Sequence, residues 1–139
     1  MASVKIIAVG KIKEKNIQEL INEYEKRLKP FIKLEIIELK DAGVVRESRE
    51  IMLLSDADTY ILDEKGSSHS SISFSELIRR AGNIKFVIGG AEGISKEAKM
   101  GAKTISLSSM TFTHEMARLF LIEQVYRAIM IINGRNYHK

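Results

Sequence analysis

The sequence contains no cysteine and only one proline, Pro30. The absence of cysteine excludes disulfide bonds, thiolate metal sites and cysteine nucleophiles. No stretch approaches the ~20 apolar residues that a membrane-spanning helix requires. The first apolar run, Val4–Val9, is short and is followed by Lys11 rather than by a small-residue cleavage site, unlike a signal peptide. These absences predict a cytoplasmic protein without a membrane partner.

Positive charge is in modest excess. The 139 residues carry a net charge of +4, with 45% hydrophobic and 29% charged residues, as expected of a single globular domain over residues 1–139. A basic balance is typical of proteins that bind nucleic acid, although solvated helix faces would also account for it. The basic residues concentrate towards the two ends of the chain, at Lys11, Lys13, Lys15, Lys26, Arg27, Lys29, Lys33, Arg127, Arg135 and Lys139.

Apolar runs alternate with amphipathic segments along the whole chain. Strands are predicted over residues 4–9, 34–39, 59–62, 85–88 and 104–107, and helices over 16–28, 44–54, 74–81, 96–101 and 113–132. Residues 66–71 are expected to form a loop, and Ser73 with Glu76 is expected to cap the helix that follows it. Strands separated by helices predict an α/β fold, with a mainly parallel sheet and helices on both faces.

The last predicted helix is apolar on more than one side. Its apolar residues are Leu119, Phe120, Leu121, Ile122, Val125, Tyr126, Ile129, Met130, Ile131 and Ile132. A helix that only covers a sheet needs a narrower apolar stripe. We therefore expect a second protein surface to cover it, most simply a copy of the same chain.

Three predicted strand ends, at residues 62–66, 88–93 and 107–112, are candidates for a ligand site. Ligands of open α/β sheets bind at the carboxyl ends of strands. Gly89, Gly90 and Gly93 would let the backbone approach a ligand closely, although a tight strand-to-helix turn explains the same spacing. Neither GxGxxG nor GxxxxGK[ST] occurs, which argues against dinucleotides and nucleoside triphosphates.

Isolated polar residues are weaker evidence for a functional site than these three segments. No two of the three histidines share a spacing typical of metal ligands, so no metal site is predicted. His114 falls beside the third strand end. Asp63 and Glu64 could bind a ribose or simply solvate a turn. Glu123 and Arg127 have the spacing of an ordinary helix salt bridge.

Five motifs follow one another along the chain. They are Leu62-Asp63-x-x-Gly66, Phe86–Gly93, Ser106-Leu107-Ser108-x-Met110-Thr111-Phe112, Glu123-Gln124-x-Tyr126-Arg127-Ala128, and the tail Tyr137-His138-Lys139. With the opening Lys5–Lys11, these motifs cover essentially the full chain, and their order and separations are highly specific. On these residues the sequence resembles the RlmH family, the large-subunit rRNA pseudouridine-N3 methyltransferases.

The resemblance implies a SPOUT fold with a C-terminal trefoil knot, a homodimer, and S-adenosylmethionine as the methyl donor. Chains avoid knots as a rule, so the strand and helix pattern alone would not predict one. By resemblance, the cofactor is contacted by Leu62, Asp63, Gly89, Gly90, Leu107, Ser108, Ser109, Met110, Thr111 and Phe112.

The resemblance also implies the reaction, methylation of N3 of a pseudouridine in 23S ribosomal RNA, on the assembled ribosome and not on DNA. We take His138 and Tyr137 of the tail as candidates for removing the N3 proton. Arg118 and Arg127 are candidates for stabilising the anion that develops on the base. In this class the partner subunit commonly completes each site, so the tail could act across the dimer. The sequence does not decide between this and action within its own chain.

The chain departs from the family at two positions. Thr113 replaces the usual proline before the last helix, a change that a helix N-cap tolerates. Asn136 replaces a proline before the terminal tyrosine and is expected to loosen the tail. Three alternatives stay open: an RNA- or ribosome-binding factor that keeps the fold but not the activity, a SPOUT enzyme acting on transfer RNA, and a flavodoxin-like binding module.

Overall fold

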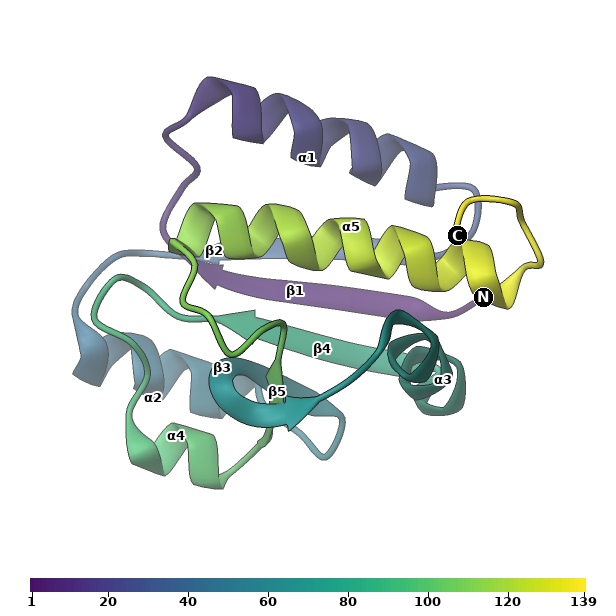
Figure 1. Cartoon of the computed structure of the whole chain (residues 1–139). Helices are drawn as coiled ribbons and strands as arrows, with labels where there is room; N and C mark the ends of the chain where they lie inside the picture. Colours follow the sequence, from purple (N-terminus) through teal and green to yellow (C-terminus); the bar gives the residue numbers. More distant parts are fainter.

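A computed structural model describes all 139 residues. Five parallel strands form one sheet in the order β2-β1-β4-β3-β5, and helices follow the strands along the chain (Figure 1). The elements are β1 Ser3–Val9, α1 Lys15–Leu28, β2 Lys33–Leu39, α2 Val44–Leu54, β3 Thr59–Ser68, α3 Ser71–Ala81, β4 Asn83–Ile88, α4 Lys96–Met100, β5 Lys103–Ser106 and α5 His114–Ile132.

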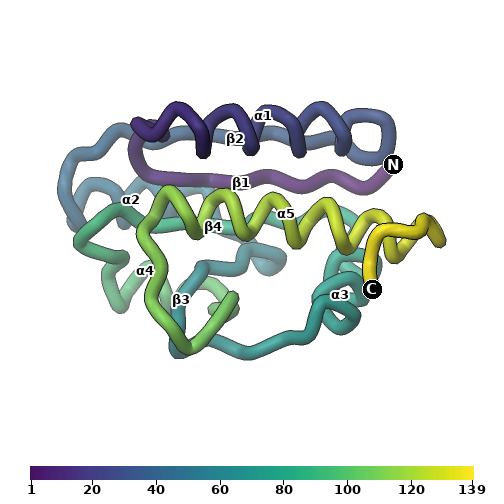
Figure 2. Tube along the Cα trace, turned by 45° about the horizontal axis from the view of Figure 1, so that its top comes forward, coloured from purple at the N-terminus to yellow at the C-terminus, as the bar shows by residue number.

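Helices cover both faces of this sheet. The larger core lies between one face and the helices α1, α3 and α5, and includes Ile6, Phe86, Ile21 and Val125. The smaller core lies on the opposite face, where Ile51 of α2 packs with residues of β1, β3 and β4. Figures 1 and 2 show the same division, with α2 and α4 on the side of the sheet away from α1 and α5. The predicted α/β architecture is confirmed.

Strand β3 continues further than the sequence predicts and wraps round β5. Ile105 of β5 pairs with Leu62 and again with Ser67, because the register shifts between these two residues of β3. The first part of the predicted loop, residues 66–68, therefore belongs to the strand. This hydrogen bonding to β5 could not be anticipated from a segment rich in glycine and serine. The C-terminal trefoil knot stays a prediction.

The predicted cap of α3 is wrong. Ser70, not Ser73, is the N-cap, and its side chain accepts a hydrogen bond from the backbone N–H of Ser73. Glu76 does not complete a capping box, because its carboxylate pairs with Arg79. The helix begins earlier than predicted, at Ser71, because β3 continues to Ser68 and the chain then turns directly into the helix. At α5 the expected cap is confirmed, with Thr113 accepting from the N–H of Met116.

Helix α5 is buried largely by its own chain. It lies on the sheet between α1 and α3, as Figures 1 and 2 show. Tyr24 of α1 meets Tyr126 of α5, with 5.7 Å between ring centroids, and Ser71 of α3 donates to Gln124 of α5 at 2.8 Å. Much of the apolar character of α5 thus has an explanation inside one subunit, and the homodimer stays a prediction. No helix is both long and apolar enough to span a bilayer.

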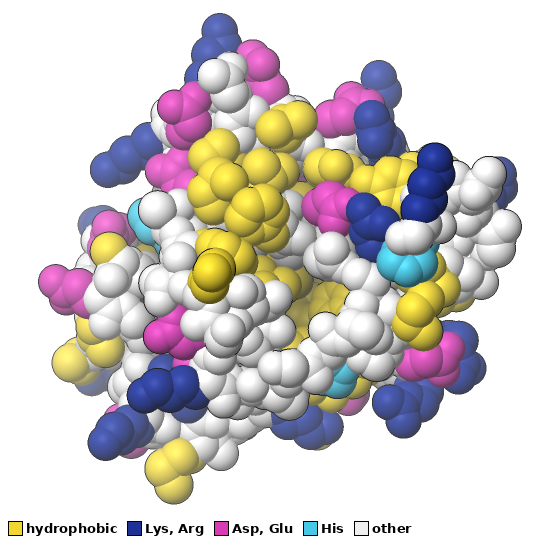
Figure 3. All heavy atoms as spheres, viewed as in Figure 1, with side chains coloured by type: hydrophobic (Ala, Val, Ile, Leu, Met, Phe, Trp, Pro, Cys, Tyr) yellow, Lys and Arg dark blue, Asp and Glu magenta, His cyan; other side chains and the backbone are white.

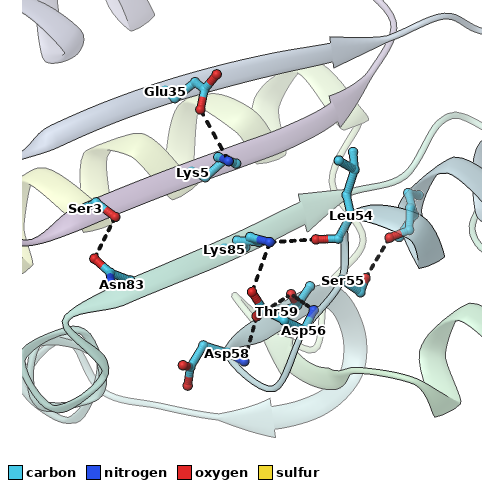
Figure 4. A network of polar contacts seen from close by, with 11 residues as sticks. Ser3, Lys5, Glu35, Leu54, Ser55, Asp56, Asp58, Thr59, Asn83 and Lys85 are labelled. Carbon is cyan, nitrogen blue, oxygen red and sulfur yellow. Dashed lines mark hydrogen bonds and ion pairs between the residues drawn. The ribbon is translucent and has the colours of Figure 1, made fainter.

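A polar network anchors the amino ends of the strands, opposite the edge where a ligand is expected. Lys85 of β4 donates to the carbonyl of Leu54 at 2.7 Å and pairs with Asp56 at 3.0 Å (Figure 4). Hydrogen bonding to Lys85 lowers the pKa of Asp56. These contacts tie the end of α2 and the segment before β3 to β4, so this end of the sheet serves the fold.

Candidate active site

The three strand ends nominated by the sequence meet in one cavity at the carboxyl edge of the sheet. The cavity has a volume of about 770 Å³ and is lined by residues 62–64 of β3, by the segments that follow β4 and β5, and by the starts of α1 and α5. Of the residues expected to contact the cofactor, it is lined by Leu62, Asp63, Gly89, Gly90, Leu107, Ser108, Met110, Thr111 and Phe112. Ser109 lies in the same loop without lining the cavity.

The glycine segment after β4 is packed too closely for side chains. A Cβ on Gly89 would lie 2.6 Å from Cγ1 of Ile94. A Cβ on Gly90 would lie 3.1 Å from Cγ1 of Val9, and Gly93 has a φ of 86°, which favours glycine. The backbone of this segment therefore forms part of the cavity wall directly.

Hydrogen bonds hold the loop after β5 in place across the cavity. The hydroxyl of Ser106 donates to the carbonyl of Ser108 at 2.8 Å, and the hydroxyl of Ser108 accepts from the N–H of Met110 at 3.0 Å. Thr111 donates to the carboxylate of Glu64, which joins the loop after β5 to β3. The loop is thus shaped by its own serines before any ligand enters.

Asp63 is already engaged at the strand end. Its carboxylate accepts from the backbone N–H of Lys65 at 3.0 Å and pairs with Lys99 of α4 at 3.0 Å. These two contacts, the first being the larger cause, hold the pKa of Asp63 below its usual range. The sequence left two roles open for Asp63, binding a ribose and solvating a turn. These contacts are of the second kind, and a contact with the cofactor stays a prediction.

The cavity is acidic in a protein that is basic overall. Four carboxylates line it, those of Glu14, Asp63, Glu64 and Glu115, against one ammonium group, that of Lys99. Such a lining attracts a positively charged ligand. Sequence reasoning missed Glu14, Glu115 and Lys99, because they come from helices that reach this edge only in the folded chain.

Glu115 also fixes the mouth of the cavity. Its Oε1 accepts from the backbone N–H groups of Lys13 at 3.2 Å and Glu14 at 3.0 Å. These hydrogen bonds, chiefly the one from Glu14, lower the pKa of Glu115. The start of α5 is thereby tied to the segment between β1 and α1, and His114 next to it lines the same cavity.

A second cavity, of about 440 Å³, lies on the other side of the loop after β5. Leu107 and Phe112 line both cavities, so these two side chains separate them. The second cavity is bounded by the serines around His69 and by Phe120, Glu123 and Gln124 of α5. The second cavity therefore lies next to the cavity of the three strand ends.

The tail folds back onto the second half of α5. Arg127 donates to Glu123 at 2.7 Å and lies 3.1 Å from Nδ1 of His138, while the hydroxyl of Tyr137 donates to Glu123 at 3.0 Å. Burial, with added hydrogen bonds, raises the pKa of Tyr137, and the bond to Glu123 raises that of Arg127. The tail thus packs against α5 through these contacts, and its loosening by Asn136 stays a prediction.

Within one chain the tail and the first cavity are apart. Glu115, at the cavity, and Glu123, at the tail, are separated by about 12 Å along α5, at ~1.5 Å per residue. Arg127, Tyr137 and His138 are therefore brought together with one another but not with the strand ends.

Arg118 lies in neither cavity. Its guanidinium is 3% exposed, pairs with Glu38 at 2.5 Å and donates to the carbonyl of Gly10 at 2.9 Å. Its Nε is buried without a partner. The structure places this candidate catalytic group in a contact that joins α5 to the ends of β1 and β2.

Comparisons with known proteins agree with this geometry. Residues 2–138 match the family described as "Predicted SPOUT methyltransferase". The chain is 43% identical over 145 residues to the "Ribosomal RNA large subunit methyltransferase H" of Thermodesulfovibrio yellowstonii, covering 99% of both chains. It is 44% identical over 140 residues to the protein of that name from Synechococcus sp., covering 97% of this chain and 95% of that one. The protein of the same name from Mycoplasmopsis synoviae is 40% identical over 146 residues, with 99% of both chains covered.

These matches span nearly the whole of every chain compared. The chain is therefore an enzyme of the SPOUT methyltransferase family, in the group of proteins called ribosomal RNA large subunit methyltransferase H.

Proposed function

We propose that this enzyme transfers a methyl group from S-adenosylmethionine to N3 of a pseudouridine in 23S ribosomal RNA, within the assembled ribosome in the cytoplasm. The observation that carries the proposal is the acidic cavity built from three glycine- and serine-bearing strand ends. The names of the relatives support ribosomal RNA as the substrate. The resemblance to the RlmH family supports the base and the atom.

The cavity fits the methyl donor in size and charge. A volume of about 770 Å³ is within the range typical of sites for small molecules and cofactors. When bound, the cofactor supplies a methyl group on a positively charged sulfur, and four carboxylates in the lining are complementary to that charge. Gly89 and Gly90 would hold it on one side and Leu107–Phe112 on the other.

The acceptor nitrogen must lose a proton during the reaction. The N3 proton of a uracil-like ring is about two to three pKa units above neutrality, a cost of ~3–4 kcal/mol at ~1.36 kcal/mol per unit. Arg127, Tyr137 and His138 form the polar cluster that would meet this cost, with the arginine favouring an anionic base and the histidine accepting the proton. Arg118 would act at a distance, by positioning α5.

A homodimer would bring this cluster to a cavity. Because the cluster and the strand ends are apart within one chain, the tail would complete the site of the partner subunit. Hydrophobic side chains gather over α1 and the first half of α5 (Figure 3). Leu20 is 49% exposed, and Phe112 and Phe120 are each 37% exposed. An apolar surface of this kind is suited to association with a second copy.

The basic residues near the start of the chain would hold the RNA. Lys11 and Lys13 are exposed and follow the carboxyl end of β1, in the segment that Glu115 ties to α5 beside the cavity. Contacts from lysine to phosphate position a nucleic acid without reading its sequence. Recognition of one pseudouridine would then come from the shape of the assembled ribosome around it.

Mass spectrometry of 23S ribosomal RNA tests this function. RNA from a strain that lacks the gene should lose one methyl group from one pseudouridine, and purified enzyme with S-adenosylmethionine should restore it on isolated ribosomes. A matched calorimetric titration should show binding of S-adenosylmethionine to the purified protein. Binding without methylation would indicate another RNA substrate, and the absence of binding would indicate a factor without activity.

A further inference from the structure

Glu47 is a buried carboxylate without a cationic partner. It is 3% exposed, and Oε2 accepts from the backbone N–H groups of Ala42 and Gly43, each at 2.8 Å. None of the ion pairs in the molecule includes it. The two N–H groups and the start of α2 supply only partial positive charge. Buried charges are rarely left unpaired, so a nearby cation would stabilise this carboxylate.

Only a glycine separates Glu47 from the cavity of the three strand ends. A Cβ on Gly90 would lie 3.2 Å from Oε1 of Glu47, and Gly90 itself lines the cavity. The wall is therefore one backbone thick at this point. A charge behind so thin a wall acts on the cavity through protein rather than through water, where it is screened less.

The neighbouring residue of α2 keeps this arrangement fixed. The hydroxyl of Ser48, which is also 3% exposed, accepts from the backbone N–H of Ser95 at 2.9 Å. Ser95 is the N-cap of α4, just beyond the glycine segment. Ser48 thus ties α2 to the residue just beyond the glycine segment. Glu47 is held in place by Ala42 and Gly43, and its carboxylate cannot turn away from Gly90 without losing these two N–H donors.

We infer that Glu47 supplies the counter-charge for the sulfonium group and makes the cavity prefer the methyl donor to the demethylated product. The inference rests on the proposed function. In the transfer, the methyl carbon exchanges its bond to sulfur for a bond to N3, sulfur keeps the electron pair as a neutral thioether, and the N3 proton passes to His138. The cofactor therefore loses one positive charge, and with it the attraction of Glu47.

The consequence is an asymmetry between substrate and product. S-adenosylmethionine and S-adenosylhomocysteine differ only in the methyl group and the charge on sulfur. A residue that merely supports the wall affects both equally, whereas a counter-charge affects the cation alone. Since it stabilises the bound donor before transfer, Glu47 is a positioning residue that lowers KM and does not raise kcat.

Calorimetric titrations of the full-length protein test the inference, using S-adenosylmethionine, S-adenosylhomocysteine and sinefungin, in which an amine replaces the methyl-sulfonium. Glu47→Gln should weaken the two cationic ligands about tenfold, as loss of one charge at this range predicts. Its affinity for S-adenosylhomocysteine should change less than about twofold. Glu50→Gln is the matched control, because Glu50 lies on the same helix in an exposed pair with Arg46 and should alter neither affinity.

Three outcomes would overturn the inference. Equal weakening of all three ligands by Glu47→Gln would show that the residue only supports the wall. Unchanged affinities would show no role, and a fall in kcat without a rise in KM would place its effect in the transition state. Glu47→Asp keeps the charge one methylene further from Gly90 and serves if the glutamine variant does not fold; it should weaken the cationic ligands selectively, though less.

The proposed function fails separately from this inference. A wild-type protein that binds none of the three ligands would contradict the use of S-adenosylmethionine itself. A wild-type protein that binds them all, with the same ratio of affinities in Glu47→Gln, would contradict only the role of Glu47.

Discussion

Gly66 occupies a position where the packing leaves no room for a side chain. A Cβ there would lie 2.6 Å from the backbone nitrogen of Ile105 and 2.8 Å from the carbonyl carbon of Thr104. These are atoms of β5, which is held by pairing with β3 on either side of this point. The glycine of the Leu62-Asp63-x-x-Gly66 motif is needed because β3 closes round another strand here.

Gly66→Ala should therefore destabilise the protein by about 3 kcal/mol, because the methyl group meets backbone that cannot move aside. Urea unfolding followed by circular dichroism measures the change. Gly101→Ala is the matched control, since a Cβ there would come no closer than 3.8 Å to other atoms. The control should lie within about 0.5 kcal/mol of the wild type. An equal effect of the two changes would contradict this packing.

At the scale of elements, three helix starts depend on an N-cap side chain that reaches a free backbone N–H group. The side chains of Ser70, Ser95 and Thr113 each accept a backbone N–H at the start of α3, α4 and α5. Two of these caps, Ser95 and Thr113, follow from the sequence. The third does not, because serines at 70, 71 and 73 are equally suited by type and only the path of β3 selects one.

Substitution of the two competing serines distinguishes the observed cap from the one expected by sequence. Ser70→Ala should cost about 1 kcal/mol, the usual value for the loss of an N-cap. Ser73→Ala should change the free energy of unfolding by less than about 0.5 kcal/mol, because Ser73 is inside the helix and alanine favours helix there. Thermal unfolding of the two variants measures both changes. A larger loss of stability in Ser73→Ala than in Ser70→Ala would contradict Ser70 as the N-cap.

At the scale of the whole molecule, the two parts of the proposed site lie at opposite ends of α5. The acidic cavity lies at its start and the Arg127, Tyr137 and His138 cluster near its end. An antiparallel pairing of two copies along the exposed apolar surface of α1 and α5 would place each cluster near the other cavity. One dimer would then contain two complete sites.

Leu20→Glu should shift this dimer towards monomers, because it places a charge in the apolar surface of α1, where Leu20 is 49% exposed. Sedimentation velocity measures the shift, and methylation of ribosomes should fall with it. Leu53→Glu is the control, since Leu53 is 81% exposed on α2, on the other face of the sheet. A monomeric wild-type protein, or an active monomeric variant, would rule out a site shared between subunits.

Much of the fold could be predicted from local pattern. The alternation of apolar strands and amphipathic helices reproduced every element in order, with most boundaries within two residues. The three strand ends could also be predicted to share an edge, because parallel strands end on the same side of a sheet. What local pattern could not supply was the second pairing of β3 with β5, since residues 66–68 lack the apolar alternation of a strand.

The sequence by itself determined the α/β class, the glycine-bearing strand ends and, through its motifs, the family. Only the tertiary structure decided the charge of the cavity, because Glu14, Glu115 and Lys99 reach it from separate helices. It alone placed Arg118 against Glu38 and Glu47 behind Gly90. The physical reason is that backbone pattern depends on neighbours in the chain, whereas electrostatics and burial depend on distances that folding creates between residues far apart in sequence.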